Sequence, residues 1–382
     1  MSDNKRRLIL TPLATITTSA QHFLDADEYL PLGTLTIFTG QGAAGKSTLA
    51  LDYVAKITNG TLPGRFYGTP RNVLIVQHED DPGMVLVPRL IAAGANIDLI
   101  TLLSVGGEDG FTTSPSLAHD IELIRAGLDE LDPALLVLDP LSSSIGGDLN
   151  AVADVRRALN PLTQIAQEYN LTVIGIAHAR KGTQGSLSDR TSGSHAFRDV
   201  ARSVLQFAVD KETGERIVTV DKASYSKNGG RSFKFVLVDS PVLLDSGETH
   251  AYARVELLGE SDLSVEDLMA RENNRGERED EHEATTWLRA YLKQGGGSAL
   301  SSEVKRAASK ERIGERQLRT ARERLCDTKR DEFGGKTTWR LRDSHDIRDI
   351  YDSDDKPREG VIYGTDPSYM GETDPSAGVT ND

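Results

Sequence analysis

A glycine-rich loop that directly follows an apolar run is the feature that most constrains how this chain can fold. Residues 34–39 are strand-like, and residues 40–47 fit the pattern G-x-x-x-x-G-K-[ST] at every specified position. In such a loop the glycines let backbone N–H groups turn inward around phosphate oxygens, and the helix that follows points its positive end at the anion. The pattern predicts a strand, a phosphate-binding loop and a helix that together hold a nucleoside triphosphate.

Two side chains of this loop have expected chemical roles. Lys46 would bridge the β and γ phosphates, and the hydroxyl of Ser47 would ligate Mg²⁺. The residues expected around the nucleotide are Gly40, Gln41, Gly42, Ala43, Ala44, Gly45, Lys46, Ser47 and Thr48.

The length and composition of the chain favour one large core, a small second domain and a tail. The chain has 382 residues, and its single cysteine, Cys326, excludes a disulfide framework. The N-terminal residues are basic, but the apolar run after them is broken at Thr11 and Pro12, so we expect no signal peptide. No apolar stretch approaches the roughly 20 residues that cross a bilayer. A cytoplasmic protein without a membrane segment is expected.

The net charge of −14 is unevenly distributed. Residues 284–342 contain 15 Lys and Arg against 7 Asp and Glu, a net charge of +8, whereas residues 343–382 contain 3 against 11, a net charge of −8. The negative net charge of the whole chain therefore does not reveal that residues 284–342 are basic, because the acidic tail offsets their charge. This basic segment has the charge expected of a nucleic-acid-binding domain.

Strand-like and helical runs alternate after the loop, which predicts an α/β domain with a mostly parallel central sheet. Nearly continuous apolar strands are expected at residues 72–78, 100–103, 134–139 and 171–177. Shorter strands at 203–209, 216–220 and 233–239 suggest an antiparallel extension at one sheet edge.

The remaining boundaries come from changes in composition. We expect a lead segment at residues 1–29, the α/β domain at 30–258, a charged linker at 259–283, a small helical domain at 284–342 and a disordered acidic tail at 343–382. In the small domain the apolar spacing predicts three helices and then a two-stranded wing that includes residues 337–341, the order of a winged helix-turn-helix.

Two carboxylates at strand ends would complete the triphosphate site. Asp139 ends an apolar strand and could reach Mg²⁺, although an aspartate there can also form a turn. Glu79 follows the strand at 72–78 and would lie on the same carboxyl-end rim as Asp139, where a base can activate water. The alternative is a solvated acidic turn, which is the better explanation of Asp80 and Asp81.

The motifs together resemble the RecA-like ATPases. The resemblance covers about residues 30–238 and is carried by residues 40–47, Glu79 with Asp80, Asp139-Pro140-Leu141, His178, and Gly193-Ser194 followed by Arg202. It is greatest to RepA-type hexameric replicative helicases, with DnaB-type helicases and RadA-type repair ATPases as relatives.

This resemblance implies an ATP-hydrolysing homo-oligomer, hexameric in the family pattern, in which His178 senses the γ-phosphate and Arg202 reaches a neighbouring subunit's site. Taken alone, a histidine at a strand end is more often structural, and Arg202 could pair with Asp199 on a helix surface. Arg198 is the alternative to Arg202 as the arginine that reaches the neighbouring subunit's site. Lys222 and Lys227 lie where relatives carry a second cation acting between subunits.

Two regions are expected to contact DNA. Arg180, Lys181 and Arg190 lie in a long polar loop that in RecA-like proteins faces a central channel and grips single-stranded DNA; a loop without a partner is the alternative. Arg316 and Arg319 lie in the third helix of the winged unit, where duplex or forked DNA would bind, unless this is a solvated or protein-binding helix.

The function expected from the sequence is that of a DNA-associated ATPase, most like a replicative helicase of a plasmid, phage or mobile element. The main alternative is a non-translocating, ATP-controlled DNA-binding regulator or a recombination or repair accessory protein. An ATPase that binds only protein is the third.

Overall fold

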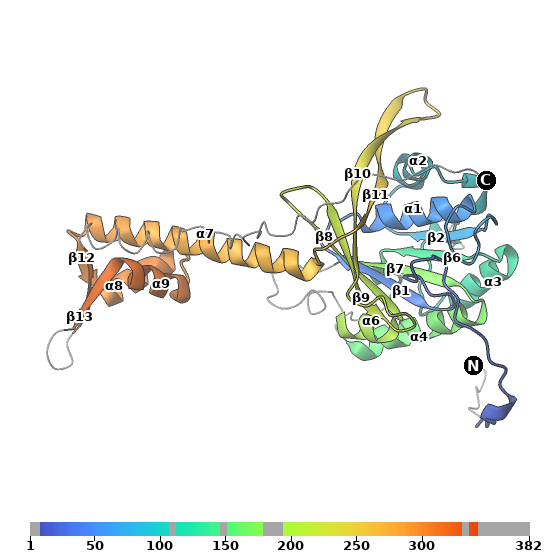
Figure 1. Cartoon of the computed structure of the whole chain (residues 1–382), viewed down its shortest axis with the longest axis horizontal. Helices are drawn as coiled ribbons and strands as arrows, with labels where there is room; N and C mark the ends of the chain where they lie inside the picture. Colours follow the sequence, from blue (N-terminus) through green and yellow to red (C-terminus); the bar gives the residue numbers. More distant parts are fainter. Residues whose placement is uncertain (1–7, 107–111, 146–150, 179–193, 331–335, 343–382) are drawn as a thin grey trace, which may run out of the picture. The chain divides into compact units, whose positions relative to one another are not determined.

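The computed structural model describes residues 8–106, 112–145, 151–178, 194–330 and 336–342. The chain divides into two units, one that extends to Glu272 and one that begins at Asn273, and each is described by itself (Figure 1). Across the described residues, the helices are too short or too polar to cross a membrane. The loop with Arg180, Lys181 and Arg190 and the acidic tail lie outside the described residues.

A nine-stranded sheet organises the large unit, with the strand order β11-β10-β9-β8-β1-β7-β6-β2-β3. The strands from β8 to β3 in this order run parallel, and β9, β10 and β11 extend the sheet antiparallel at one edge. The α/β architecture and the mostly parallel sheet are thus confirmed. The strand bounds are β1 (Leu35–Gly40), β2 (Val73–Gln77), β3 (Ile100–Leu102), β6 (Leu135–Asp139), β7 (Thr172–His178), β8 (Ser203–Val209), β9 (Arg216–Ala223), β10 (Ser232–Leu243) and β11 (Thr249–Glu260).

Helices cover both faces of this sheet (Figure 1). On one face α1 (Lys46–Thr58) and α2 (Val87–Ala92) enclose a core that includes Phe38. On the other, α3 (Ile121–Leu131), α4 (Val152–Glu168) and α6 (Ser194–Val200) pack over a core that includes Ile37. Successive strand residues point to opposite faces, so both must be apolar, which explains the continuous apolar runs in the sequence.

Short elements connect these layers. They are the 3₁₀ turns at Leu13–Thr15, Ile97–Leu99 and Leu141–Ser144, a π-helical turn at Pro82–Leu86, and the strand pair β4 (Val105–Gly106) and β5 (Thr112–Thr113). The peptide bond between Asp139 and Pro140 is cis.

The antiparallel edge is longer than the sequence pattern predicts. β10 and β11 have 12 residues each, whereas the apolar pattern suggested one strand at 233–239 and none near 250. β11 forms the sheet edge, and Val255 is its buried residue. A strand with so little burial carries a weak hydrophobic signal.

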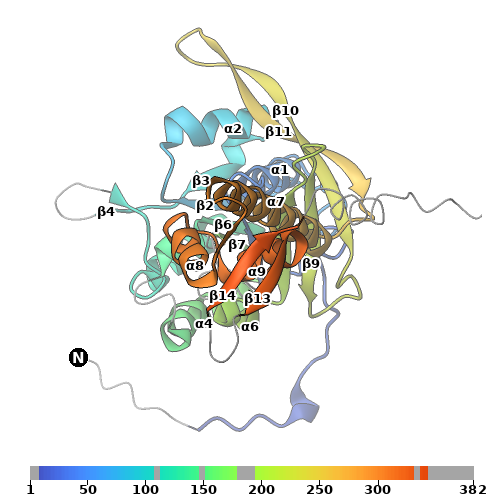
Figure 2. The same ribbon diagram turned by 90° about the vertical axis from the view of Figure 1, so that its left-hand side faces the viewer.

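The small unit contains most of α7 (Val265–Gln294), together with α8 (Ser301–Lys310) and α9 (Glu315–Leu325). A three-stranded sheet with the order β12-β14-β13 completes it, formed by β12 (Ser298–Leu300), β13 (Cys326–Arg330) and β14 (Thr337–Leu341), and Figure 2 shows β13 and β14 beside the helices. The unit has its own core, which includes Leu288, Leu318 and Trp339.

One strand of this region was not expected: β12 has only three residues. The segment expected as a charged and partly helical linker, residues 259–283, contains the end of β11 and the first part of α7. A polar composition does not prevent a helix, because Glu, Arg and Ala all have good helix propensity.

Candidate functional site

The phosphate-binding loop leaves the carboxyl end of β1, between two neighbouring strands. Gly40 pairs with His178 of β7 and Phe207 of β8. A Cβ atom at Gly40 would lie 2.4 Å from the carbonyl oxygen of Phe207, and one at Gly45 would lie 2.8 Å from the ring of Phe235. Both glycines also have positive φ angles, 155° and 87°. Glycine is therefore required here by the close approach of the loop to β8 and β10.

Lys46 is the first residue of α1 and is almost fully buried. Its Nζ donates hydrogen bonds to the carbonyl oxygens of Gly40 at 3.0 Å and Gln41 at 2.7 Å. Burial lowers the pKa of Lys46 to about 8, and the charges of Asp139 and Glu79 oppose this shift. An ammonium group in this position can neutralise the charge of phosphate oxygens at the loop.

Asp139, the last residue of β6, lies beside Ser47. Burial raises the pKa of Asp139, and a hydrogen bond with the side chain of Ser47 opposes that rise. β7 separates β6 from β1 in the sheet, so the two residues come together across the carboxyl-end rim. A carboxylate and a hydroxyl are the hard oxygen donors that Mg²⁺ takes alongside phosphate and water, so these residues fit that ion.

Glu79 follows β2 on the same rim and is exposed. It lies near enough to Lys46 and Asp139 for its charge to raise the pKa of both. The backbone N–H of His78 donates to the carbonyl oxygen of Asp139 at 3.1 Å, and His78 Nε2 lies 2.7 Å from Ser144 Oγ. These bonds fix the chain on which Glu79 projects, in a position suited to a base acting on water.

Arg89 of α2 is a charged residue at this site that sequence reasoning missed. Its Nη2 donates to Thr48 Oγ1 at 3.2 Å, and its Nη1 lies 3.5 Å from Asp80 Oδ2. The Arg89 charge also lowers the pKa of Asp139. The available signal was the turn before the helix: Asp81 accepts from the N–H of Met84 at 2.7 Å, and Pro82 follows it, which marks a helix start.

His178 ends β7 and is exposed next to Gly40, between the β1 and β6 strand ends. A positive charge on His178 would lower the pKa of Asp139. The predicted sensor residue is therefore at the site, on the strand that separates the loop from Asp139.

Arg202 lies at the opposite end of β1 from the loop. Its backbone N–H donates to the carbonyl oxygen of Leu35 at 3.0 Å, and its guanidinium carbon is 6.0 Å from the centre of the Tyr225 ring. The five-residue step from Leu35 to Gly40 spans roughly 16 Å of extended chain. Arg202 therefore cannot reach the loop of its own chain.

A polar groove of about 830 Å³ surrounds Arg202, and its lining includes Arg156, Asp199 and Tyr225. The expected alternative, an ion pair between Asp199 and Arg202, is wrong: Asp199 pairs with Arg156 at 2.9 Å, because α4 packs along α6. The guanidinium of Arg202 instead contacts the Tyr225 ring.

Two of the competing cations, Arg198 and Lys222, have partners of their own. Arg198 forms an ion pair with Asp221 at 2.7 Å, and Lys222 Nζ donates to the carbonyl oxygen of Arg198 at 2.7 Å. Burial, together with the charges of Arg198 and Arg202, lowers the pKa of Lys222. Lys227 is exposed after β9. Arg198 is thus paired within its own chain.

Two arginines of α9, Arg322 and Arg324, contact residues of the small unit. The guanidinium of Arg322 lies 5.9 Å from the centre of the Trp339 ring, and Arg324 pairs with Glu281 at 3.0 Å, so both contribute to the small unit itself. The predicted contact residues Arg316 and Arg319 are both exposed, and Arg319 approaches Glu323 only to 3.9 Å.

Comparison with known proteins gives one family match. Residues 17–184, less than half of the chain, match a family described as an AAA domain. No curated protein matches the chain. Among solved structures, a crystal structure of the RadB recombinase has 19% identity and a TM-score of 0.39, and the match covers 55% of this chain and 89% of that one. So distant a likeness leaves activity and partners to be argued from this chain's own residues.

The matched residues 17–184 include the glycine-rich loop at the carboxyl end of β1 and the rim on which Glu79 and Asp139 lie.

Proposed function

We propose that this protein is a homo-oligomeric, DNA-associated ATPase, in which the small unit is a winged helix. One observation supports this most directly. The rim of the sheet at the carboxyl end of β1 carries Lys46, Ser47, Glu79 and Asp139, whereas Arg202 lies at the opposite end of β1. Such a subunit carries most of a hydrolytic site at one end and an arginine at the other. Head-to-tail contact between copies would complete each site and would close a ring, for which we propose six subunits.

The placement of these residues supports a route for hydrolysis. The loop N–H groups and Lys46 would hold the phosphates, and Ser47 and Asp139 would hold Mg²⁺, which would supply positive charge against the phosphate oxygens. Glu79 orients a water molecule in line with the γ-phosphate and accepts its proton. Arg202 of a neighbouring copy neutralises the charge that develops on the transferred group, and His178 contacts the same phosphate.

The charge and the fold of the small unit support the DNA part of the proposal. Residues 284–342 have a net charge of +8, and Arg316 and Arg319 are exposed on α9, the helix that precedes the β13–β14 pair. In winged-helix proteins this helix contacts the major groove while the strand pair contacts the backbone. The loop with Arg180, Lys181 and Arg190 is proposed to contact single-stranded DNA.

A replicative helicase-like motor is the favoured form of this ATPase. The second candidate is a non-translocating regulator or repair accessory protein whose assembly is controlled by ATP, and it is favoured by the separate core of the small unit, which could recognise a site without translocation.

An ATPase assay tests the common part of the proposal. The full chain is assayed with single-stranded DNA, duplex DNA or neither, and its mass in solution is measured with ATP. We expect DNA to stimulate turnover of the wild type, and Lys46→Ala and Glu79→Gln to abolish it. If Glu79→Gln loses turnover but still binds nucleotide, Glu79 acts as a base; if it loses binding as well, Glu79 is a binding residue. Normal turnover of Glu79→Gln would remove it from the mechanism, and unwinding of a tailed duplex distinguishes a motor from a regulator.

A further inference from the structure

The first turns of α7 lie beside the tip of the phosphate-binding loop. A small cavity of about 40 Å³ is lined by Gln41 and Gly42 of the loop, by the end of β8, and by Leu268, Met269 and Glu272 of α7. All of these residues belong to the large unit. The same helix continues to Gln294 and supplies Leu288 and Leu292 to the core of the small unit. One continuous helix thus contacts the loop and also forms part of the small unit.

The start of α7 is firmly held on the large sheet. Val265 and Leu268 are buried against Ile217 of β9, and the N–H of Val265 donates to Thr219 Oγ1 at 2.9 Å. Ser264 and Asp267 cap the first turn: the N–H of Asp267 donates to Ser264 Oγ at 3.1 Å, and the N–H of Ser264 donates to Asp267 Oδ2 at 2.9 Å. These contacts make the first turns of α7 a defined wall of the cavity.

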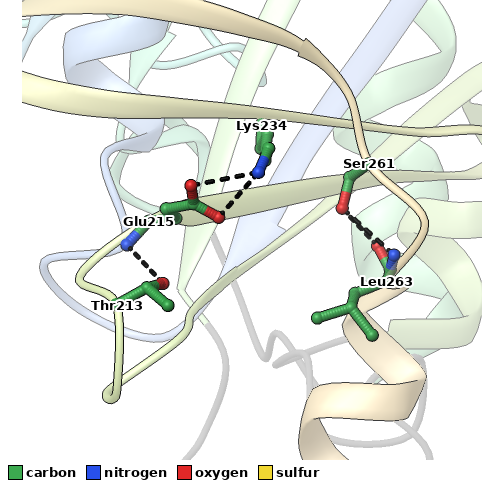
Figure 3. Close-up of polar contacts among 5 residues, drawn as sticks. All are labelled: Thr213, Glu215, Lys234, Ser261 and Leu263. Atoms are coloured by element: carbon green, nitrogen blue, oxygen red, sulfur yellow. Dashed lines mark hydrogen bonds and ion pairs between the residues drawn. The ribbon is translucent and has the colours of Figure 1, made fainter.

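Neighbouring polar contacts stabilise the strands and the turn on which this wall rests. Figure 3 shows Lys234 Nζ of β10 donating to both carboxylate oxygens of Glu215, at 3.0 and 3.1 Å, next to β9. It also shows the turn before α7, in which Ser261 Oγ donates to the carbonyl oxygen of Leu263 at 2.9 Å. At the other end of the wall, Glu272 pairs with Lys211, which follows β8, at 2.9 Å.

The loop can change its contacts on this wall. Lys46 Nζ donates to the carbonyl oxygen of Gln41, a cavity residue, and an ammonium that moves to phosphate oxygens would release that carbonyl. Gly42 has room to shift, since a Cβ atom there would meet nothing within 4 Å. Gly40 has none, because Phe207 of β8 is packed against it. Rearrangement is therefore confined to the tip, the part that faces α7.

We propose that the loop tip and the first turns of α7 form a coupling device. When Lys46 transfers its hydrogen bonds to the nucleotide, Gln41 and Gly42 repack against Leu268, Met269 and Glu272, and α7 transmits the change to the small unit. Nucleotide then alters the affinity of the small unit for DNA, and DNA alters the affinity for nucleotide by the same factor. This inference rests on the proposed binding of nucleotide and DNA, but the contact between the loop and α7 can be tested without DNA.

Hydrogen exchange on the full chain tests the first step. Amide exchange is measured with and without Mg²⁺ and an imido-bridged ATP analogue. We expect slower exchange of loop residues 41–46 and, in addition, a change of about twofold or more at residues 265–272. Protection of the loop with no change at 265–272 would overturn the coupling proposal and leave nucleotide binding intact. No protection of either segment would contradict nucleotide binding itself, and the coupling proposal with it.

An interrupted helix tests the second step. Two glycines inserted between Glu272 and Asn273, directly after the last cavity residue, would weaken α7 between the cavity and the small unit, and the same insertion in the exposed turn between Asp245 and Ser246 is the matched control. In wild type and control we expect the analogue to change the Kd for a duplex oligonucleotide about fivefold or more. In the α7 variant the change should fall below about twofold, with the analogue bound as in wild type. A full nucleotide effect in the α7 variant, or none in wild type, would overturn transmission through the helix.

Discussion

The ammonium group of Lys46 donates a 2.7 Å hydrogen bond to the carbonyl oxygen of Gln41, a residue of its own phosphate-binding loop. Carbonyl oxygens of the loop therefore accept hydrogen bonds from the lysine that is expected to bind the nucleotide. Burial lowers the pKa of that lysine to about 8. Binding of a triphosphate has to exchange these carbonyl bonds for bonds to phosphate, and it has to hold the lysine in its charged form.

Nucleotide affinity should accordingly fall above pH 8. Phosphate favours the ammonium form, so binding above the free pKa takes up a proton, and the Kd should rise about tenfold per pH unit above 8. Below pH 8 the lysine is already charged and the affinity should be flat. The lowered pKa of Lys46 affects folding in the opposite direction. The buried ammonium destabilises the folded protein fully below pH 8, and this destabilisation fades as the pH rises toward 10.5.

Calorimetric titrations at several pH values between about 7 and 9.5 measure this dependence, and Lys46→Arg is the control because a guanidinium stays charged throughout. A Kd for the wild type that does not change over this range would contradict a titrating Lys46.

Arg89→Ala should slow turnover more than it weakens binding. Arg89 joins Thr48 of α1 to Asp80, next to Glu79, so its loss should misplace the base and lower kcat by about tenfold to a hundredfold, with KM changed less than about threefold. Arg89→Lys should recover only part of the rate, because one ammonium cannot bridge both partners as a guanidinium does. Arg71→Ala, which removes a surface ion pair with Asp132, is the matched control for folding. If KM rises while kcat is unchanged, Arg89 is a binding residue instead.

Arg202→Ala should lose turnover while keeping nucleotide affinity, since this arginine lies at the far end of β1 from its own loop. Mixed with Lys46→Ala, it should regain activity, because each variant supplies the half-site that the other lacks. Steady-state hydrolysis across a series of mixing ratios measures the rescue. Activity that stays absent at every ratio would argue against an arginine acting between subunits.

Truncation after Arg342 should tighten DNA binding at low salt. It removes a tail of net charge −8 that follows a unit of net charge +8, and the tail would otherwise compete with DNA phosphates. The gain should shrink as ionic strength rises, because the competition is screened. Titrations of both proteins at two salt concentrations, with Arg319→Ala as a weakened-binding reference, decide the question. Equal affinities at low salt would mean that the tail has a different role.

Much of the site could be predicted from local sequence. Gly40 and Gly45 mark a loop that approaches its neighbours too closely for a Cβ atom, and such glycine spacing is visible in any sequence. Asp139 and Glu79 could be placed because parallel strands end at one rim, so that residues following apolar runs converge there.

Other parts could not be predicted, because their signals were weak or belonged to another segment. β11 buries little, so its alternation of side chains is faint. Arg89 follows no motif, and its place beside Thr48 depends on how α2 packs on α1. The partner of Asp199 is Arg156, 43 residues away, and not Arg202, three residues away, which helical spacing suggested.

The sequence by itself determined the phosphate loop, the alternating strands and helices, and the charge division between the basic unit and the tail, because each of these depends on residues near one another in the chain. Only the tertiary structure decided that Arg202 and Lys46 lie at opposite ends of β1, that Arg89 joins the site, and that α7 begins against the loop tip. These are long-range relationships, fixed by packing across the sheet, and packing depends on residues that no local pattern brings together.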